Sequence, residues 1–174
     1  MIVTEQFVKM EIKTSMEEKI VILVSACLAG LKVRYNGTDC VNDRIQQLIA
    51  DKKAITVCPE VMGGLSTPRD PAEIIGGNGD DVLDGKAIVQ NIAGKDVTDE
   101  FVKGAYVTLK KAQEVGATTV ILKESSPSCG SNKIYNGKFN GQKMIGMGVT
   151  AALLRRNNIT VFSDEQLESF FEQL

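Results

Sequence analysis

Residues 20–25 read Ile-Val-Ile-Leu-Val-Ser, an unbroken apolar and largely β-branched run that ends in a small residue. Such runs are typical of strands that are covered on both faces in a parallel sheet. Three similar runs follow along the chain, at residues 54–57, 118–122 and 159–162. We therefore expect four buried strands.

Helical patterns separate these strands. Asn42 is a good N-cap for a short helix with apolar residues at helical spacing, and Thr98 is one for a longer helix. Residues 149–156 repeat the pattern, and a capping box of Ser163 with Gln166 begins a last helix. This alternation predicts an α/β fold, a Rossmann-like open sheet of about four mainly parallel strands with helices on both faces.

Two long connections interrupt the alternation. Residues 59–96 form a loop rich in glycine and proline, and residues 124–147 form a second loop. Connections of this length usually carry function. Within the first, Asp84-Gly85 lies between short apolar runs, which predicts a small hairpin over residues 82–92.

The composition fits one ordinary globular domain. The chain has 174 residues, of which 43% are hydrophobic and 24% charged, with a formal net charge of −2. We expect a single domain over residues 19–174, preceded by an unassigned extension over residues 1–18. Because the charge is nearly balanced, we expect a small-molecule ligand and neither nucleic acid nor a membrane as partner.

The targeting features predict a cytoplasmic protein. The longest apolar run is far shorter than the ~20 residues that a membrane helix needs, and no signal-peptide pattern precedes it. The four cysteines stand at positions 27, 40, 58 and 129, which is too uneven for a secreted disulfide framework.

Three of the cysteines lie where strands end, in a chain without histidine. Cys27 and Cys58 closely follow the first two predicted strands, and Cys129 lies in the loop after the third. Ligands gather at the carboxyl ends of parallel strands, so these thiols can converge there. Three thiolates without histidine suit a 4Fe-4S cluster with one open iron better than zinc. The alternative is that they are ordinary buried cysteines.

Polar residues beside these cysteines are candidates for chemistry. Glu60 stands two residues after Cys58 and is a candidate general acid or base. Ser126 and Ser128 precede Cys129 and are candidates to hydrogen-bond a polar ligand. The alternatives are a solvated loop glutamate and an ordinary Ser-Pro turn.

Two further segments supply cations and an aromatic ring. Arg34-Tyr35 precedes an Asn-Gly turn and suits the binding of a planar base, and Arg69 supplies a second cation from a Thr-Pro-Arg segment. Ordinary surface turns also carry such residues, which is the alternative. Gly76-Gly-Asn-Gly79 lacks the Lys-Ser/Thr pair of a phosphate loop, so we expect no nucleoside triphosphate.

Eight short motifs occur in the same order as in one known family. They are Val24-Ser-Ala-Cys-Leu28, Arg34-Tyr-Asn-Gly37, Cys58-Pro-Glu-Val-Met-Gly-Gly64, Thr67-Pro-Arg69, Asp81-Val-Leu-Asp-Gly85, Asp96-Val-Thr98, Ile121-Leu-Lys-Glu-Ser-Ser-Pro-Ser-Cys-Gly130 and Gly148-Val-Thr-Ala-Ala152. Together they resemble the thiouracil desulfidase family, long known as a bacterial domain of unknown function. The resemblance runs from about Lys19 to Phe162.

The resemblance implies an enzyme that hydrolyses the thiocarbonyl of a thiolated pyrimidine base to a carbonyl and sulfide. It implies a 4Fe-4S cluster held by Cys27, Cys58 and Cys129, with its open iron binding the substrate sulfur, and catalytic roles for Glu60 and Ser126. Arg34, Tyr35, Arg69 and Ser128 are the expected substrate-binding residues. Cys40 matches none of the motifs and is expected to be no ligand.

Two positions depart from the family pattern. Val33 stands where relatives often carry another cysteine, which implies that this extra cysteine is not a ligand. Asn36 stands where aspartate is usual, which argues against any role that needs a charge there.

An alternative function uses the same three thiols without hydrolysis. The chain would then be an iron-sulfur or metal-binding module that carries sulfur or senses redox state. Glu60 discriminates, because a pure sensor needs no acid-base group beside its open iron. A metal-free cysteine hydrolase is disfavoured, because the usual histidine base is missing.

Overall fold

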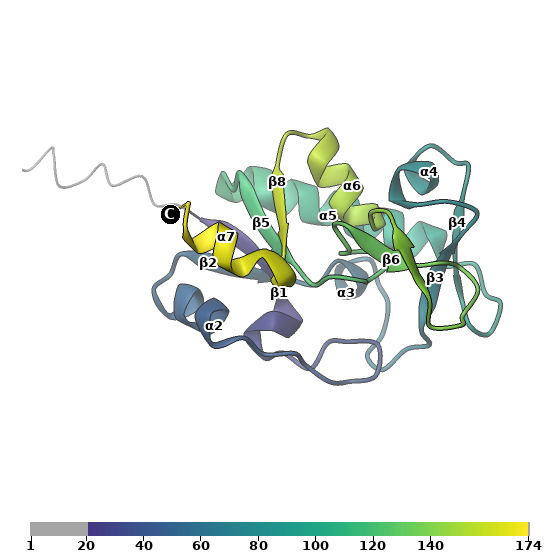
Figure 1. The fold of residues 1–174 in the computed structure, drawn as a ribbon, viewed down its shortest axis with the longest axis horizontal. Helices are drawn as coiled ribbons and strands as arrows, with labels where there is room; N and C mark the ends of the chain where they lie inside the picture. Colours follow the sequence, from purple (N-terminus) through teal and green to yellow (C-terminus); the bar gives the residue numbers. More distant parts are fainter. Residues whose placement is uncertain (1–20, 174) are drawn as a thin grey trace, which may run out of the picture.

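The structure, a computed structural model, describes residues 21–173, so the expected extension over residues 1–18 lies outside the described residues, as do Ile20 and Leu174. Its central strands are β1 (Ile22–Ser25), β2 (Ala54–Val57), β5 (Thr119–Leu122) and β8 (Thr160–Ser163). They form one parallel sheet in the order β2-β1-β5-β8 (Figure 1). The predicted α/β class, with about four mainly parallel strands, is confirmed.

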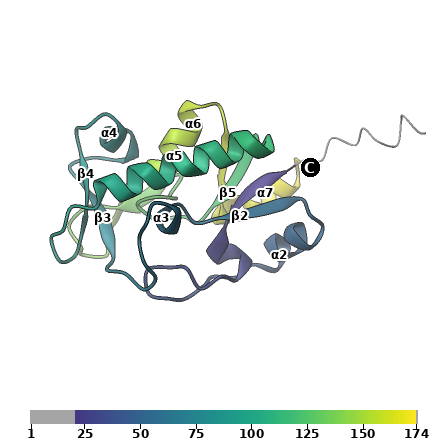
Figure 2. The same cartoon turned by 180° about the vertical axis from the view of Figure 1, so that it is seen from behind.

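Helices cover both faces of this sheet, as predicted (Figures 1 and 2). The helices are α5 (Thr98–Val115) and α6 (Val149–Arg156) on one face, and α2 (Asp43–Ala50) and α7 (Leu167–Phe171) on the other. Each strand divides its side chains between two hydrophobic cores. In β1, Leu23 packs in the core with α5 and α6, whereas Ile22 and Val24 pack in the core with α2 and α7. An apolar run without alternation is what a strand buried on both sides requires.

The connection over residues 59–96 contains more regular structure than its composition predicts. Its elements are α3 (Pro59–Met62), β3 (Ala72–Ile75), α4 (Gly79–Leu83) and β4 (Ile88–Asn91). An antiparallel pair is present, but it joins β3 to β4. Asp84-Gly85, expected as its turn, instead ends α4, because a capping box of Asn78 with Asp81 starts a helix just before it.

Two further segments differ from expectation, and one predicted helix start is confirmed. The second long loop contains an unpredicted hairpin of β6 (Lys133–Tyr135) and β7 (Lys143–Ile145). Thr98 is the first residue of α5 rather than its N-cap, and its hydroxyl accepts the N–H of Val89 at 2.9 Å. The last helical region begins with a 3-10 turn, η2 (Asp164–Gln166), which the predicted capping box of Ser163 with Gln166 does start.

Helix α3 crosses α5 at very close range, and this contact fixes the segment that carries Cys58 and Glu60. A Cβ atom on Gly63 would strike the backbone oxygen of Glu100, and one on Gly104 would strike the backbone oxygen of Pro59. Only glycine allows this approach. Within residues 21–173, no helix has both the length and the apolar character needed to cross a bilayer.

Candidate functional site

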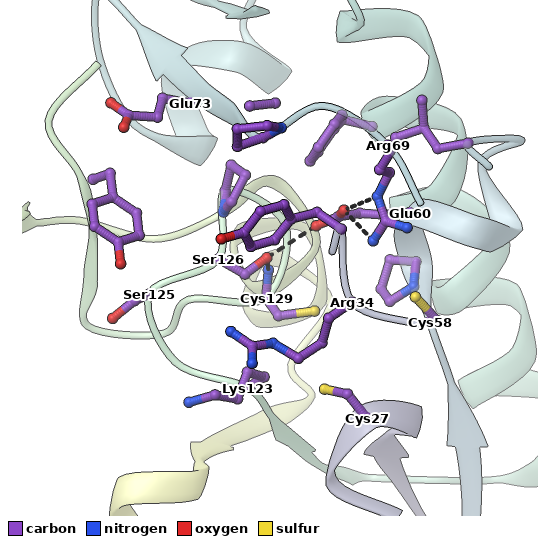
Figure 3. Close-up of a pocket in the computed structure, with 18 of the residues that line it drawn as sticks. Cys27, Arg34, Cys58, Glu60, Arg69, Glu73, Lys123, Ser125, Ser126 and Cys129 are labelled. Carbon is purple, nitrogen blue, oxygen red and sulfur yellow. Dashed lines mark hydrogen bonds and ion pairs between the residues drawn. The ribbon is translucent and has the colours of Figure 1, made fainter. Parts of the chain in front are cut away.

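The three strand-end cysteines line one cavity of about 970 Å³. Cys27 lies in η1 (Ala26–Ala29), directly after β1, and Cys58 lies between β2 and α3. Cys129 lies in the turn that follows β5. Their sulfur atoms face a shared space in Figure 3. β1 and β5 are the central neighbours of the sheet, from which the chain crosses to β2 on one side and β8 on the other, so the site lies at the switch point of the topology.

The donor set of this site favours a positively charged partner. Cys27 and Cys129 are buried, and Cys58 is half-buried. Burial raises the pKa of Cys129 to about 12, and the negative charges of Cys58 and Glu60 act in the same direction. Burial is also the main cause that raises the pKa of Cys27 and of Cys58. Three thiolates would therefore be unstable here on their own, and a bound metal centre would supply the compensating charge.

No three His, Cys, Asp or Glu side chains within residues 21–173 converge closely enough to hold a single metal ion. The three thiols instead stand around a space. Cysteine thiolates on several sides of one cavity are the donors that an iron-sulfur cluster uses.

Glu60 projects from the first turn of α3 and is held from one side by Arg69. The guanidinium donates to the same carboxylate oxygen, Oε2, from Nε at 2.7 Å and from Nη2 at 2.6 Å. The two side chains are only 15% and 9% exposed. Arg69 also donates to the backbone oxygens of Val33 at 3.0 Å and Ser66 at 3.1 Å. Arg69, predicted as a substrate-binding residue, lines the cavity, but its guanidinium is engaged by protein groups.

Ser126 links this carboxylate to the turn of Cys129. Its Oγ donates to the other oxygen of Glu60, Oε1, at 3.2 Å, and accepts the N–H groups of Ser128 at 3.0 Å and Cys129 at 3.1 Å. The structure does not bring Ser128 to the cavity. Its hydroxyl is fully buried and lies 2.8 Å from that of Thr150 on α6.

Arg34 and Tyr35 lie on the wall of the cavity, with Tyr35 41% exposed. The backbone oxygen of Tyr35 accepts the N–H of Arg69 at 2.8 Å, which joins this loop to the Glu60 pair. Asn36 accepts the N–H and the hydroxyl of Thr38, so an uncharged residue serves the local turn. The predicted site residues other than Ser128 therefore share one cavity.

Glu124 is a structural residue of the site that local patterns did not identify. Its buried carboxylate accepts backbone N–H bonds from Ser125, Ser131, Asn132 and Lys133, and the hydroxyl of Ser131. Burial raises the pKa of Glu124, but these hydrogen bonds outweigh it and hold the pKa at about 2. The bond to Ser125 supports a left-handed backbone with φ of 69°, which residues other than glycine rarely adopt. Its place two residues after a predicted strand was the only sequence signal.

Lys123 and Glu73 also border the cavity, and neither was predicted as a site residue. Lys123 forms an ion pair with Asp164 at 2.8 Å, and its N–H donates to the hydroxyl of Ser25 at 2.9 Å. Glu73 of β3 is buried and accepts the N–H of Phe139 at 3.1 Å, which ties the β6–β7 hairpin loop to the wall. The cavity thus extends from the thiols to the two antiparallel pairs.

Comparison with known proteins identifies close relatives. The chain matches the family model of 2-thiouracil desulfurase over residues 22–166. It is similar to the uncharacterized protein YbbK of Bacillus subtilis strain 168, at 53% identity over 146 residues, which covers 84% of this chain and 97% of that one. Its fold is similar to the solved structure of the 4Fe-4S-dependent thiouracil desulfidase TudS, with a TM-score of 0.76 and 47% identity over 85% of this chain and 93% of that one.

Proposed function

The chain belongs to the 2-thiouracil desulfurase family, and from this premise we propose that it is a desulfidase acting on a thiouracil-like pyrimidine base. The reaction is a hydrolysis. Water supplies the oxygen of the new carbonyl, the carbon-sulfur bond breaks, and the sulfur leaves as sulfide. One observation carries the proposal: three thiols and the Glu60 carboxylate line the same cavity.

The cofactor is a 4Fe-4S cluster, as in the solved relative, and Cys27, Cys58 and Cys129 are the proposed ligands. A cluster held by these three thiolates would leave one iron without a protein ligand, and this iron would supply Lewis-acid chemistry toward the thiocarbonyl. The burial of Cys27 and Cys129 supports this assignment, because it keeps bulk water from two of the three sulfur ligands.

Glu60 is the proposed general base that takes a proton from the attacking water. Arg69 holds Oε2, so the carboxylate cannot rotate freely, and its Oε1 stays beside Ser126. Ser126 orients this group and ties it to the turn of Cys129, so the base and a proposed ligand move together. Arg69 is therefore a positioning residue in this proposal, rather than a substrate contact.

Arg34 and Tyr35 are the proposed substrate contacts. A ring and a guanidinium at the half-exposed wall of the cavity can stack on a planar base and donate to its ring oxygen or nitrogen. The Ser128 hydroxyl pairs with the Thr150 hydroxyl of α6 and so anchors the turn that carries Cys129. We assign Ser128 to this turn instead of to the substrate.

The rival function, a sulfur-carrying or redox-sensing module, does not account for the Glu60 arrangement. A buried carboxylate held by an arginine and a serine is costly to build, and storage of a cluster alone does not need it. Hydrolysis does need a base at this place.

The test is anaerobic reconstitution followed by turnover. The full-length chain should take up about four irons and four sulfides. It should then release one sulfide for each 2-thiouracil or 4-thiouracil converted to uracil, which liquid chromatography and a sulfide assay measure. Uptake of the cluster without any conversion of either base would favour the redox module. A colourless chain after reconstitution would refute the cofactor assignment.

A further inference from the structure

Cys40 has no role in the site described above, yet it lies against one of the proposed cluster ligands. The segments that begin at Cys27 and at Cys40 run side by side. The N–H of Cys40 donates to the backbone oxygen of Cys27 at 3.1 Å, and the N–H of Asn42 donates to that of Leu28 at 2.8 Å. Gln46 adds a side-chain bond to the backbone oxygen of Ala29 at 3.3 Å.

The two side chains lie in the same hydrophobic cluster. Cys40 packs against the core that contains Cys27, and it is near enough to contribute to the raised pKa of the Cys27 thiol. Cys40 is half-buried, whereas Cys27 is only 8% exposed. Cys40 is not among the residues that line the cavity, whereas Cys27, Cys58 and Cys129 are.

We propose that Cys40 and Cys27 form a reversible disulfide when the cluster is lost in the presence of a peroxide. The bond would block the ligand position while it exists and would return the ligand thiol on reduction. This inference takes from the proposed function only the role of Cys27 as a ligand. The pairing itself depends on geometry that the chain has without any cofactor.

The chemistry balances with a peroxide as the two-electron oxidant. Hydrogen peroxide converts the more exposed Cys40 thiol to a sulfenic acid and is reduced to one water. The sulfur of Cys27 then attacks the sulfenic sulfur, the S–S bond forms, and the hydroxyl leaves with the thiol proton as a second water. Two thiols are oxidised, and one peroxide is reduced.

The disulfide would stop the oxidation of the thiols at a stage that reduction can reverse. A lone sulfenic acid goes on to sulfinic and sulfonic acids, which thiol reductants do not reverse. A neighbouring thiol captures the sulfenic acid first. Because backbone hydrogen bonds hold the two segments together, the partner stays in place after the cluster has gone.

The test starts from the reconstituted full-length protein. It is treated with hydrogen peroxide until its visible absorbance is lost, its free thiols are alkylated, and its peptides are mapped by mass spectrometry without reduction. A peptide pair linked through Cys27 and Cys40 should dominate, and two of the four thiols should stay alkylatable. After dithiothreitol, the wild type should regain nearly all its iron on reconstitution.

Cys40→Ser is the matched variant, since it changes one atom outside the cavity. It should bind a cluster before treatment but should lose most of its capacity to rebind iron afterwards, with Cys27 found as sulfinic or sulfonic acid. Linkage of Cys27 to Cys58 or Cys129, or equal recovery of Cys40→Ser and wild type, would overturn the proposal. If no cluster can be loaded, the proposed function fails, while the same mapping on the reduced chain still decides the pairing.

Discussion

Glu124→Gln should remove a pH-dependent part of the stability that is worth about 3 kcal/mol at neutral pH. The carboxyl has a pKa of about 2 in the folded chain against an ordinary value of 4.5. Each pKa unit corresponds to ~1.4 kcal/mol, so the ionised form favours folding by about 3 kcal/mol. Because the folded pKa is the lower one, this stability is present above the ordinary pKa and is lost as the pH falls toward 2. About 1.4 kcal/mol of it is gone at about pH 3.5.

Urea unfolding of the cluster-free chain measures this effect. The difference in free energy of unfolding between wild type and Glu124→Gln should be about 1.4 kcal/mol smaller at about pH 3.5 than at about pH 6. Glu165→Gln is the matched control, because Glu165 is half-exposed and bonds Lys133 by an ion pair at 3.2 Å. It should change little with pH. An equal gap between wild type and Glu124→Gln at both pH values would refute the reasoning.

Four further substitutions test the site. Glu60→Gln should lower kcat by about 10²- to 10⁴-fold with unchanged iron content, and normal turnover would remove Glu60 from the mechanism. Cys129→Ala should lose visible absorbance and activity together, whereas an intact cluster would reject the ligand assignment. Arg69→Lys keeps the charge but cannot place two nitrogens on one carboxylate oxygen of Glu60. The kcat should therefore fall by up to about a hundredfold at nearly constant KM. A change in KM alone would make Arg69 a substrate contact. Gly104→Ala pushes a methyl group into a backbone oxygen of α3, and urea unfolding should show a free energy of unfolding lower by about 1 to 3 kcal/mol. The control Lys103→Ala, at an exposed position of α5, should not lower it. Equal stability of the two variants would show that α3 can move.

The meeting of Cys27, Cys58 and Cys129 could be predicted because it follows from strand periodicity alone. Each strand is a short apolar run, and a parallel sheet brings all carboxyl ends to one edge, whatever the sequence separation. The prediction needed no knowledge of the loops. The same reasoning could not place Cys40 relative to the other three cysteines, because its position depends on how one loop returns to β1.

The hairpin predicted over residues 82–92 was misplaced because the sequence at Asp84-Gly85 fits two local structures. Asp84-Gly85 is equally suitable as a two-residue turn and as the end of a helix. The deciding signal was Asn78 with Asp81, three residues apart, which caps the first turn of α4. Strand pairing then takes place across the helix, between β3 and β4, and not across the turn.

The interior roles of Glu124 and Ser128 could not be predicted, because their partners are set by tertiary packing. Ser128 pairs with Thr150 from a helix that follows the whole β6–β7 hairpin. Glu124 collects N–H groups from both ends of a loop whose path the sequence does not specify. The Ser128 hydroxyl, expected at a ligand, and the Glu124 carboxylate, for which no role was predicted, both hold the backbone of the Cys129 turn.

The order of the three cysteines along the chain also determines when each becomes available during synthesis. Cys27 and Cys58 leave the ribosome early, and Cys129 follows about 70 residues after Cys58, an interval of about 4 to 14 s at roughly 5 to 20 residues per second. For most of that time β5, the strand that lies between β1 and β8, has not been synthesised. A cluster delivered to the nascent chain would meet two of its three anchors. Cofactor delivery should therefore follow translation, and an assembly factor would have to recognise the finished fold.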